Sequence, residues 1–141
     1  MAETIKIKYI NSPHLEKTDK GDWIDLYVAE DITFKPLDFK LIPLGVAMKL
    51  PDGYEAITAP RSSTFKRYGL IQTNSIGVID SSYCGDDDQW MWPALATRAV
   101  HIPKGTRLCQ FRIQKKQEEI DFEEVQHLNY ESRSGFGSTG A

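Results

Sequence analysis

The chain has 141 residues, 40% of them hydrophobic, which suits one globular domain with a buried core. Its formal net charge of −3 argues against a nucleic acid or an anionic membrane as partner, because such partners select a basic surface. Residues 1–9 hold no continuous apolar run typical of a signal or membrane span, and two cysteines, Cys84 and Cys109, are too few for a disulfide scaffold. We therefore expect a cytoplasmic protein.

Short strands are predicted where apolar residues alternate with polar ones or form short runs between turn residues. In chain order these runs cover residues 5–9, 24–28, 54–58, 76–79, 107–113 and 122–125. One short helix is expected over residues 64–68, where a serine of Ser62-Ser63 could cap the first free N–H groups and Gly69 could end the helix. The pattern predicts an all-β sandwich or barrel with one short helix.

The last residues, 129–141, change in composition. They are rich in glycine and serine and too poor in apolar side chains to join a core. We expect residues 1–128 to form the β domain and residues 129–141 a mobile arm. In that arm Phe136 offers a ring that could stack on a base, and Arg133 a positive charge.

Two segments carry groups that suit a phosphate chain. At the junction before the expected helix, Arg61 supplies a guanidinium, and Ser62 and Ser63 supply hydroxyls beside the N–H groups of a helix start. Strand alternation places Gln110 on the face opposite Cys109, where its amide could reach a phosphate. A capped surface helix and a solvated sheet face are the simpler alternatives.

The segment from Asn74 to Tyr83 is interpreted as a β-hairpin whose free N–H and C=O groups could pair with the edge of a pyrimidine. Asp80 could orient and deprotonate a water, and the ring of Tyr83 could pack under a sugar. Asp80 could equally be a turn-forming aspartate, because its side chain readily bonds nearby backbone.

Two other features favour no site. The acidic run Asp86–Asp88 is expected to be a solvated loop, since adjacent carboxylates alone do not define a metal site. The three histidines, His14, His101 and His127, have no ligand spacing that would hold a transition metal.

Five blocks, taken in order, resemble the motifs of the trimeric dUTPase family. They are Asp25-Leu26, Pro60-Arg61-Ser62-Ser63 with Gly69-Leu70, Gly77 to Tyr83, Arg107-Leu108-Cys109-Gln110, and Gly135-Phe136-Gly137-Ser138-Thr139-Gly140. Each block is short, but five in this order cover nearly the whole chain.

This resemblance implies a jelly-roll-like subunit, a homotrimer with active sites built from all three chains, and Mg²⁺-assisted hydrolysis of dUTP to dUMP and pyrophosphate. Such an activity limits uracil incorporation into DNA and supplies dUMP for dTMP synthesis. By this resemblance Asp80 would order the attacking water, Tyr83 would pack against the sugar, and the backbone near Asn74 and Ile79 would contact uracil. The phosphates would be bound by Arg61, Ser62, Ser63 and Gln110. The arm would close over the site through Arg133, Phe136, Gly137, Ser138 and Thr139. Asp25 would touch the hydration shell of the ion.

Two alternatives stay open. A dCTP deaminase of the same fold would need a glutamate near the base, for which Glu55 is the candidate. A regulatory module that senses nucleotide would keep the pocket but would not need Asp80.

Overall fold

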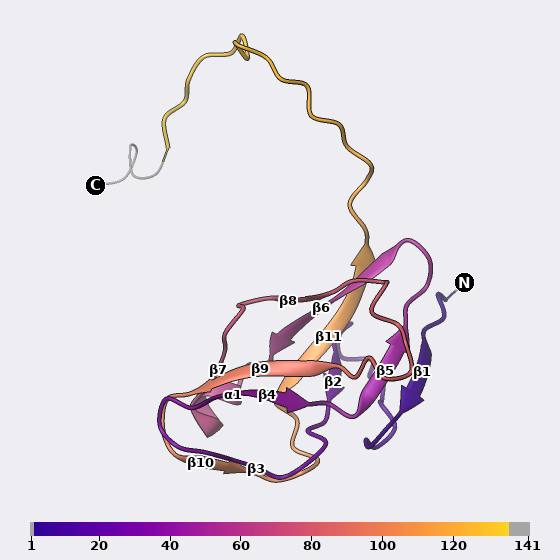
Figure 1. Ribbon diagram of the computed structural model, residues 1–141, viewed down its shortest axis with the longest axis vertical. Helices are drawn as coiled ribbons and strands as arrows, with labels where there is room; N and C mark the ends of the chain where they lie inside the picture. Colours follow the sequence, from indigo (N-terminus) through magenta and orange to yellow (C-terminus); the bar gives the residue numbers. More distant parts are fainter. Residues whose placement is uncertain (1, 136–141) are drawn as a thin grey trace.

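The chain is described by a computed structural model, which covers residues 2–135 (Figure 1). Over these residues it forms eleven short strands and one helix. The elements are β1 (Lys6–Tyr9), β2 (Ile24–Leu26), β3 (Ile32–Phe34), β4 (Phe39–Pro43), β5 (Val46–Lys49), β6 (Tyr54–Pro60), α1 (Thr64–Tyr68), β7 (Leu70–Gln72), β8 (Gly77–Ile79), β9 (Met91–Ala96), β10 (Val100–Ile102) and β11 (Cys109–Lys115). The prediction of an all-β chain with one short helix is confirmed.

The strands form two larger antiparallel sheets and two ribbons. The first sheet has the order β2-β11-β6-β8, and the second has the order β4-β9-β7. The ribbons are β1-β5 and β10-β3. The pairing of β11 with β6 runs from Cys109 opposite Pro60 to Lys115 opposite Tyr54. Because β11 also pairs with β2, it is one of the two inner strands of the first sheet.

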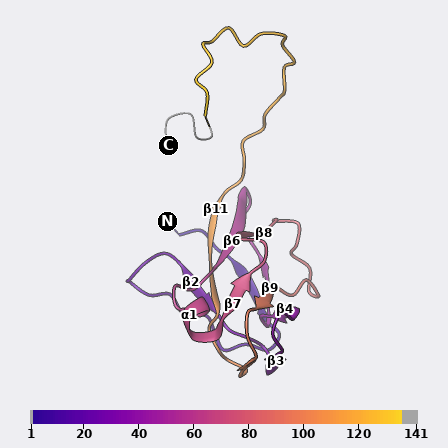
Figure 2. The same ribbon diagram turned by 90° about the vertical axis from the view of Figure 1, so that its left-hand side faces the viewer.

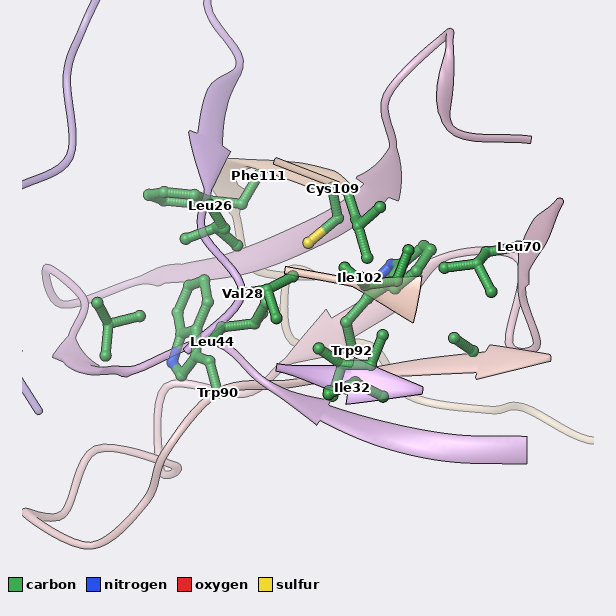
Figure 3. Packing of buried hydrophobic residues seen from close by; sticks show 14 of the residues in the cluster. Leu26, Val28, Ile32, Leu44, Leu70, Trp90, Trp92, Ile102, Cys109 and Phe111 are labelled. Carbon is green, nitrogen blue, oxygen red and sulfur yellow. The ribbon is translucent and has the colours of Figure 1, made fainter. Parts of the chain in front are cut away.

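Both larger sheets contribute to one hydrophobic core (Figure 3). In β9 the buried residues alternate with exposed or half-buried ones, as expected for a strand with one buried face, and Trp92 lies fully inside. Trp90, just before β9, is also fully buried and meets Phe111 of β11 edge-on, with ring centroids 5.1 Å apart. The indole N–H of Trp92 donates to the buried amide oxygen of Gln72, which joins β9 to β7.

The helix has the predicted bounds, but its start is held differently from the prediction. Ser63 occupies the N-cap position without a side-chain capping hydrogen bond. Instead the hydroxyl of Thr64 donates to the carbonyl of Leu108 over 2.6 Å, so the helix start is tied to the segment before β11. Gly69 ends the helix in the left-handed region with φ 67°, as predicted.

Five of the six predicted strand runs correspond to β1, β2, β6, β8 and β11, with ends shifted by a few residues. The strand predicted over residues 122–125 is wrong, because this stretch is irregular and exposed and pairs with no strand among residues 2–135. The predicted hairpin over residues 74–83 is also wrong. The strand β8 pairs with β6, and after it the N–H of Tyr83 donates to the carbonyl of Asp80, which forms a turn where a returning strand was expected.

The chain leaves the body of the protein after β11. The N–H of Lys116 donates to the carbonyl of Gly53, and residues 117–135 are then exposed and extend away (Figures 1 and 2). The boundary between a β domain and an arm at residues 128 and 129 stays a prediction. Within residues 2–135 no helix is long and apolar enough to cross a membrane.

Candidate functional site

A pocket of about 440 Å³ lies at the end of β8, and we call it the Asp80 pocket. Three of the predicted site residues line this pocket: Ile79, Asp80 and Tyr83. Its lining residues are Val78, Ile79, Asp80, Ser82, Tyr83, Trp90 and Met91. The pocket therefore sets a carboxylate and an aromatic ring beside an apolar surface.

Asp80 is held in its charged form by Ser82. Both the hydroxyl and the backbone N–H of Ser82 donate to Asp80 Oδ2, the latter over 2.9 Å. These hydrogen bonds, from the side chain first and the backbone second, hold the pKa of the Asp80 carboxyl below its ordinary value of 3.8, with a smaller contribution from the charge of Lys116. Sequence reasoning did not select Ser82, although a serine two residues after an aspartate is a known turn pattern.

Tyr83 is fixed at both ends. Its N–H donates to the carbonyl of Asp80 over 3.0 Å, and its hydroxyl donates to the carbonyl of Gln89 over 2.7 Å. The ring lies at the edge of the Asp80 pocket with 40% of the residue exposed. It can therefore pack against a ligand without first having to order itself.

A second pocket of about 430 Å³ lies beside the helix, and we call it the Arg61 pocket. Arg61 and Ser62 line it, together with Ser75 from the turn between β7 and β8. The remaining lining residues are Pro60, Phe65, Leu70, Ile71 and Gln72. The predicted phosphate-binding junction therefore does border a cavity.

Asp25, Arg61 and Gln110 meet at one end of the first sheet. Asp25 of β2 lies opposite Gln110 of β11, and Arg61 Nε lies 3.3 Å from Asp25 Oδ1. Arg107 Nη1 lies 3.4 Å from Asp25 Oδ2, and Gln110 Nε2 donates to the carbonyl of Pro60 over 3.2 Å. The two guanidiniums give this end of the sheet a local positive charge of the kind that suits a phosphate chain. Sequence reasoning left Arg107 out, although it stands three residues before Gln110.

Other selected residues lie outside both pockets. Ser63 is half-buried at the start of the helix, where its carbonyl accepts from the N–H of Arg67. Asn74 is exposed in the turn between β7 and β8, and its neighbour Ser75 faces the Arg61 pocket instead. Arg133 is exposed and far along the chain from the body. Phe136, Gly137, Ser138 and Thr139 lie outside the described residues.

The Asp80 pocket and the Arg61 pocket share no lining residue. The described residues of one chain therefore separate the carboxylate and ring from the arginine and serine. In residues 2–135 no group of three or more His, Cys, Asp or Glu side chains is placed to hold a metal ion. Cys109 is buried, and burial raises the pKa of its thiol, so it stays neutral and unreactive.

Comparison with known proteins identifies the chain's relatives. The dUTPase family model matches residues 13–140. The SPbeta prophage-derived deoxyuridine 5'-triphosphate nucleotidohydrolase YosS of Bacillus subtilis (strain 168) is 56% identical over 138 residues, which cover 96% of this chain and 97% of that protein.

Two solved structures share the fold. The dUTPase of Staphylococcus bacteriophage 80alpha with dUPNHPP superimposes with a TM-score of 0.84 at 20% identity, covering 99% of this chain and 100% of that chain. A mutant dUTPase from phage phi11 of S. aureus, which coordinates a structural Mg(II) ion, superimposes with a TM-score of 0.77 at 18% identity, covering 90% of this chain and 99% of that chain. The family model and the identity to YosS together show that this chain belongs to the dUTPase family.

Proposed function

We propose that the protein is a dUTP diphosphatase, which hydrolyses dUTP to dUMP and pyrophosphate. The observation that carries this proposal is the Asp80 carboxylate, which Ser82 keeps charged at the edge of a pocket that also holds an aromatic ring. A charged carboxylate can orient a water and accept its proton as the water attacks the phosphate chain. Pyrophosphate then leaves, and the proton that Asp80 accepted passes to solvent.

The remaining selected residues have roles in binding. Tyr83 packs against the deoxyribose and leaves no space for a 2′-hydroxyl, while Ile79 and the backbone near Asn74 contact uracil. Arg61, with Ser62, Ser63 and Gln110, binds the phosphates, where charge develops as the bond breaks. The arm, residues 129–141, closes over the site through Arg133 and Phe136 with Gly137, Ser138 and Thr139, and closure excludes water from the reaction.

We also propose Mg²⁺ as the cofactor. Both oxygens of Asp25 face arginines, at 3.3 and 3.4 Å, and its side chain is 27% exposed, so a contact through water suits this carboxylate better than direct coordination. Mg²⁺ commonly keeps several waters and binds substrate phosphates, which fits a site with few protein carboxylates. When bound, the ion would neutralise phosphate charge, and Asp25 would orient its hydration shell.

We also propose a homotrimer, and the outer face of the second sheet supports association of copies of the chain. The outward residues of this sheet are apolar without interruption: Phe39, Leu41 and Pro43 from β4, Met91, Pro93 and Leu95 from β9, and Ile71 from β7. Phe39 and Leu41 are 55% and 57% exposed, which is unusual for a contiguous apolar face of a monomer. Met91 also lines the Asp80 pocket and Ile71 the Arg61 pocket, so a second copy docked here would lie against both.

The deaminase alternative loses its candidate residue. Glu55 lies on β6, where its carboxylate accepts from Gln114 Nε2 over 2.7 Å, and it lines neither pocket.

We further propose a reducing cytoplasmic compartment, which the free thiols of Cys84 and Cys109 support.

The test is product formation with each nucleotide in the presence of Mg²⁺. We expect pyrophosphate from dUTP and little from dCTP, dTTP or UTP. Asp80→Asn should bind dUTP but release no pyrophosphate, whereas Asp87→Asn, which changes an exposed carboxylate of the nearby loop, should behave as wild type. Ammonia from dCTP would favour the deaminase, and binding of dUTP without any product would favour the regulatory module.

The trimer has its own test. Leu41→Glu places a charge in the apolar face and should give a smaller species in sedimentation equilibrium, with loss of activity. Lys104→Glu, a charge change on an exposed turn, is the matched control and should leave the assembly intact. An unchanged mass for Leu41→Glu would show that this face does not hold the subunits together.

A further inference from the structure

The loop of residues 83–89, between β8 and β9, is closed on itself by hydrogen bonds. The hydroxyl of Tyr83 at its start donates to the carbonyl of Gln89 at its end, over 2.7 Å. Inside the loop the N–H of Gly85 donates to Asp88 Oδ2 over 2.8 Å, and the N–H of Asp88 donates to the carbonyl of Gly85 over 3.1 Å. The 83–89 loop therefore has a defined conformation although most of its side chains are exposed.

Gln89 connects this loop to the body of the protein. Its side-chain Oε1 accepts from the N–H of Gly45 over 2.9 Å. Gly45 has φ +71°, and a Cβ added to it would lie 2.2 Å from the carbonyl oxygen of Asn11, so this turn is closely packed. The next residue, Trp90, is fully buried, and its N–H donates to the carbonyl of Val46 over 2.9 Å. The backbone that carries the Gln89 carbonyl is thus held by the Gln89 side chain and by the N–H of Trp90.

Tyr83 takes its orientation from this carbonyl. The hydroxyl of a tyrosine lies on the long axis of its ring, so a contact at the backbone and another at the hydroxyl together fix χ1, and with it the place that the ring occupies. We propose that Gln89 is a positioning residue that fixes the Tyr83 ring and thereby sets the discrimination between deoxyribose and ribose substrates. This inference rests on the proposed function, in which the ring packs against the deoxyribose.

The physical reason is that a steric contact between the Tyr83 ring and a ribose 2′-hydroxyl excludes UTP only if the ring stays in place. Selection between dUTP and UTP is a difference between two transition-state affinities, and a ring that can swing aside about χ1 makes room for the extra oxygen. If the Gln89 side chain no longer holds Gly45, the carbonyl that receives the Tyr83 hydroxyl gains freedom. We then expect UTP turnover to rise relative to dUTP turnover.

The experiment compares kcat/KM for dUTP and UTP, measured as pyrophosphate release, in four variants of the full chain. Gln89→Ala should lower the dUTP to UTP ratio about two- to tenfold, the range that follows from one lost hydrogen bond. The change should fall mainly on the KM for UTP. Gln89→Glu keeps an oxygen acceptor for the Gly45 N–H and should therefore show the same dUTP to UTP ratio as the wild type. Asp87→Asn, in the same loop, should leave the ratio unchanged.

Tyr83→Phe removes the same hydroxyl contact without disturbing Gly45, and it therefore tests the inference even where Gln89→Ala folds poorly. We expect a fall in the ratio of similar size. An unchanged ratio in both variants would overturn the inference, and so would equal losses with the two substrates. A wild-type chain that releases no pyrophosphate from dUTP would instead contradict the proposed function itself.

Discussion

Gly77 allows β8 to lie against β6, and replacing it with alanine should displace the strand that leads to Asp80. Gly77 lies opposite Thr58, and a Cβ built on it would be 2.1 Å from Thr58 Oγ1. Thr58 is only 3% exposed, so its hydroxyl has little space to move into. Overpacking of this kind costs about 1–3 kcal/mol, and alanine recovers roughly 0.5–1 kcal/mol of that through its lower backbone entropy. We expect Gly77→Ala to lower the free energy of unfolding by about 1–2 kcal/mol and to reduce turnover.

A double mutant tests whether the contact itself is responsible. Thr58→Ala removes Oγ1 and leaves the Cβ of residue 58 at 3.4 Å from the added methyl, which is ordinary van der Waals contact. The double variant should therefore be more stable than the sum of the single effects by about 1 kcal/mol or more. Urea unfolding at one fixed protein concentration measures this, because the proposed association of subunits would also contribute to stability. Additive effects, within about 0.5 kcal/mol, would refute the reasoning.

Two further predictions concern Asp80 and the buried Gln72. Ser82→Ala removes the largest cause of the lowered pKa of Asp80, so that pKa should rise. In the proposed mechanism the charged form of Asp80 accepts the proton of the water, so kcat/KM should fall at a higher pH than in wild type as the solution is acidified. An unchanged acid limb in a pH–rate profile would contradict this. Gln72→Leu leaves the indole N–H of Trp92 and the carbonyl of Thr58 without their partner, and should lower the free energy of unfolding by about 2–4 kcal/mol. A loss below about 0.5 kcal/mol in urea unfolding would count against that network.

Local pattern was sufficient for the fold class and for several elements. The alternation around Ile7, Asp25 and Phe111 predicted three strands that the structure contains, and the residues 64–68 between Ser63 and Gly69 predicted the helix. The failures have a physical cause. Residues 122–125 alternate like a strand, but strand formation also needs a neighbour, which a single sequence does not provide. The pattern predicts a solvated loop at Asp86–Asp88, but the burial of Trp90 just after it follows only from the tertiary fold.

The sequence indicated individual residues of the candidate site, but it did not indicate how they are arranged relative to one another. Asp80 and Tyr83 belong to one short block, so local spacing already indicated that they would share a pocket. Ser82 and Gln89 act through hydrogen bonds to these two residues, and such contacts depend on turn and loop geometry that the spacing does not specify. The meeting of Arg107 with Asp25 spans 82 positions and follows from the pairing of β2 with β11.

The separation of the two pockets leads to a prediction about mixtures. Asp80 and Arg61 line different cavities of one subunit, so we expect each active site to take Asp80 from one chain and Arg61 from a neighbour. Asp80→Asn and Arg61→Ala should each be inactive alone. If equal amounts are unfolded together and refolded, random assembly should give about a quarter of the sites both wild-type residues, and with them about a quarter of wild-type activity.

The same mixture distinguishes a shared site from a local one. If both residues acted within one chain, every site would carry one defective residue, and mixing would restore nothing. Mixing without unfolding should also restore little, because exchange requires the subunits to separate first. Sedimentation equilibrium must show equal masses for the mixture and the wild type, so that a failure of assembly is not mistaken for a site inside one chain.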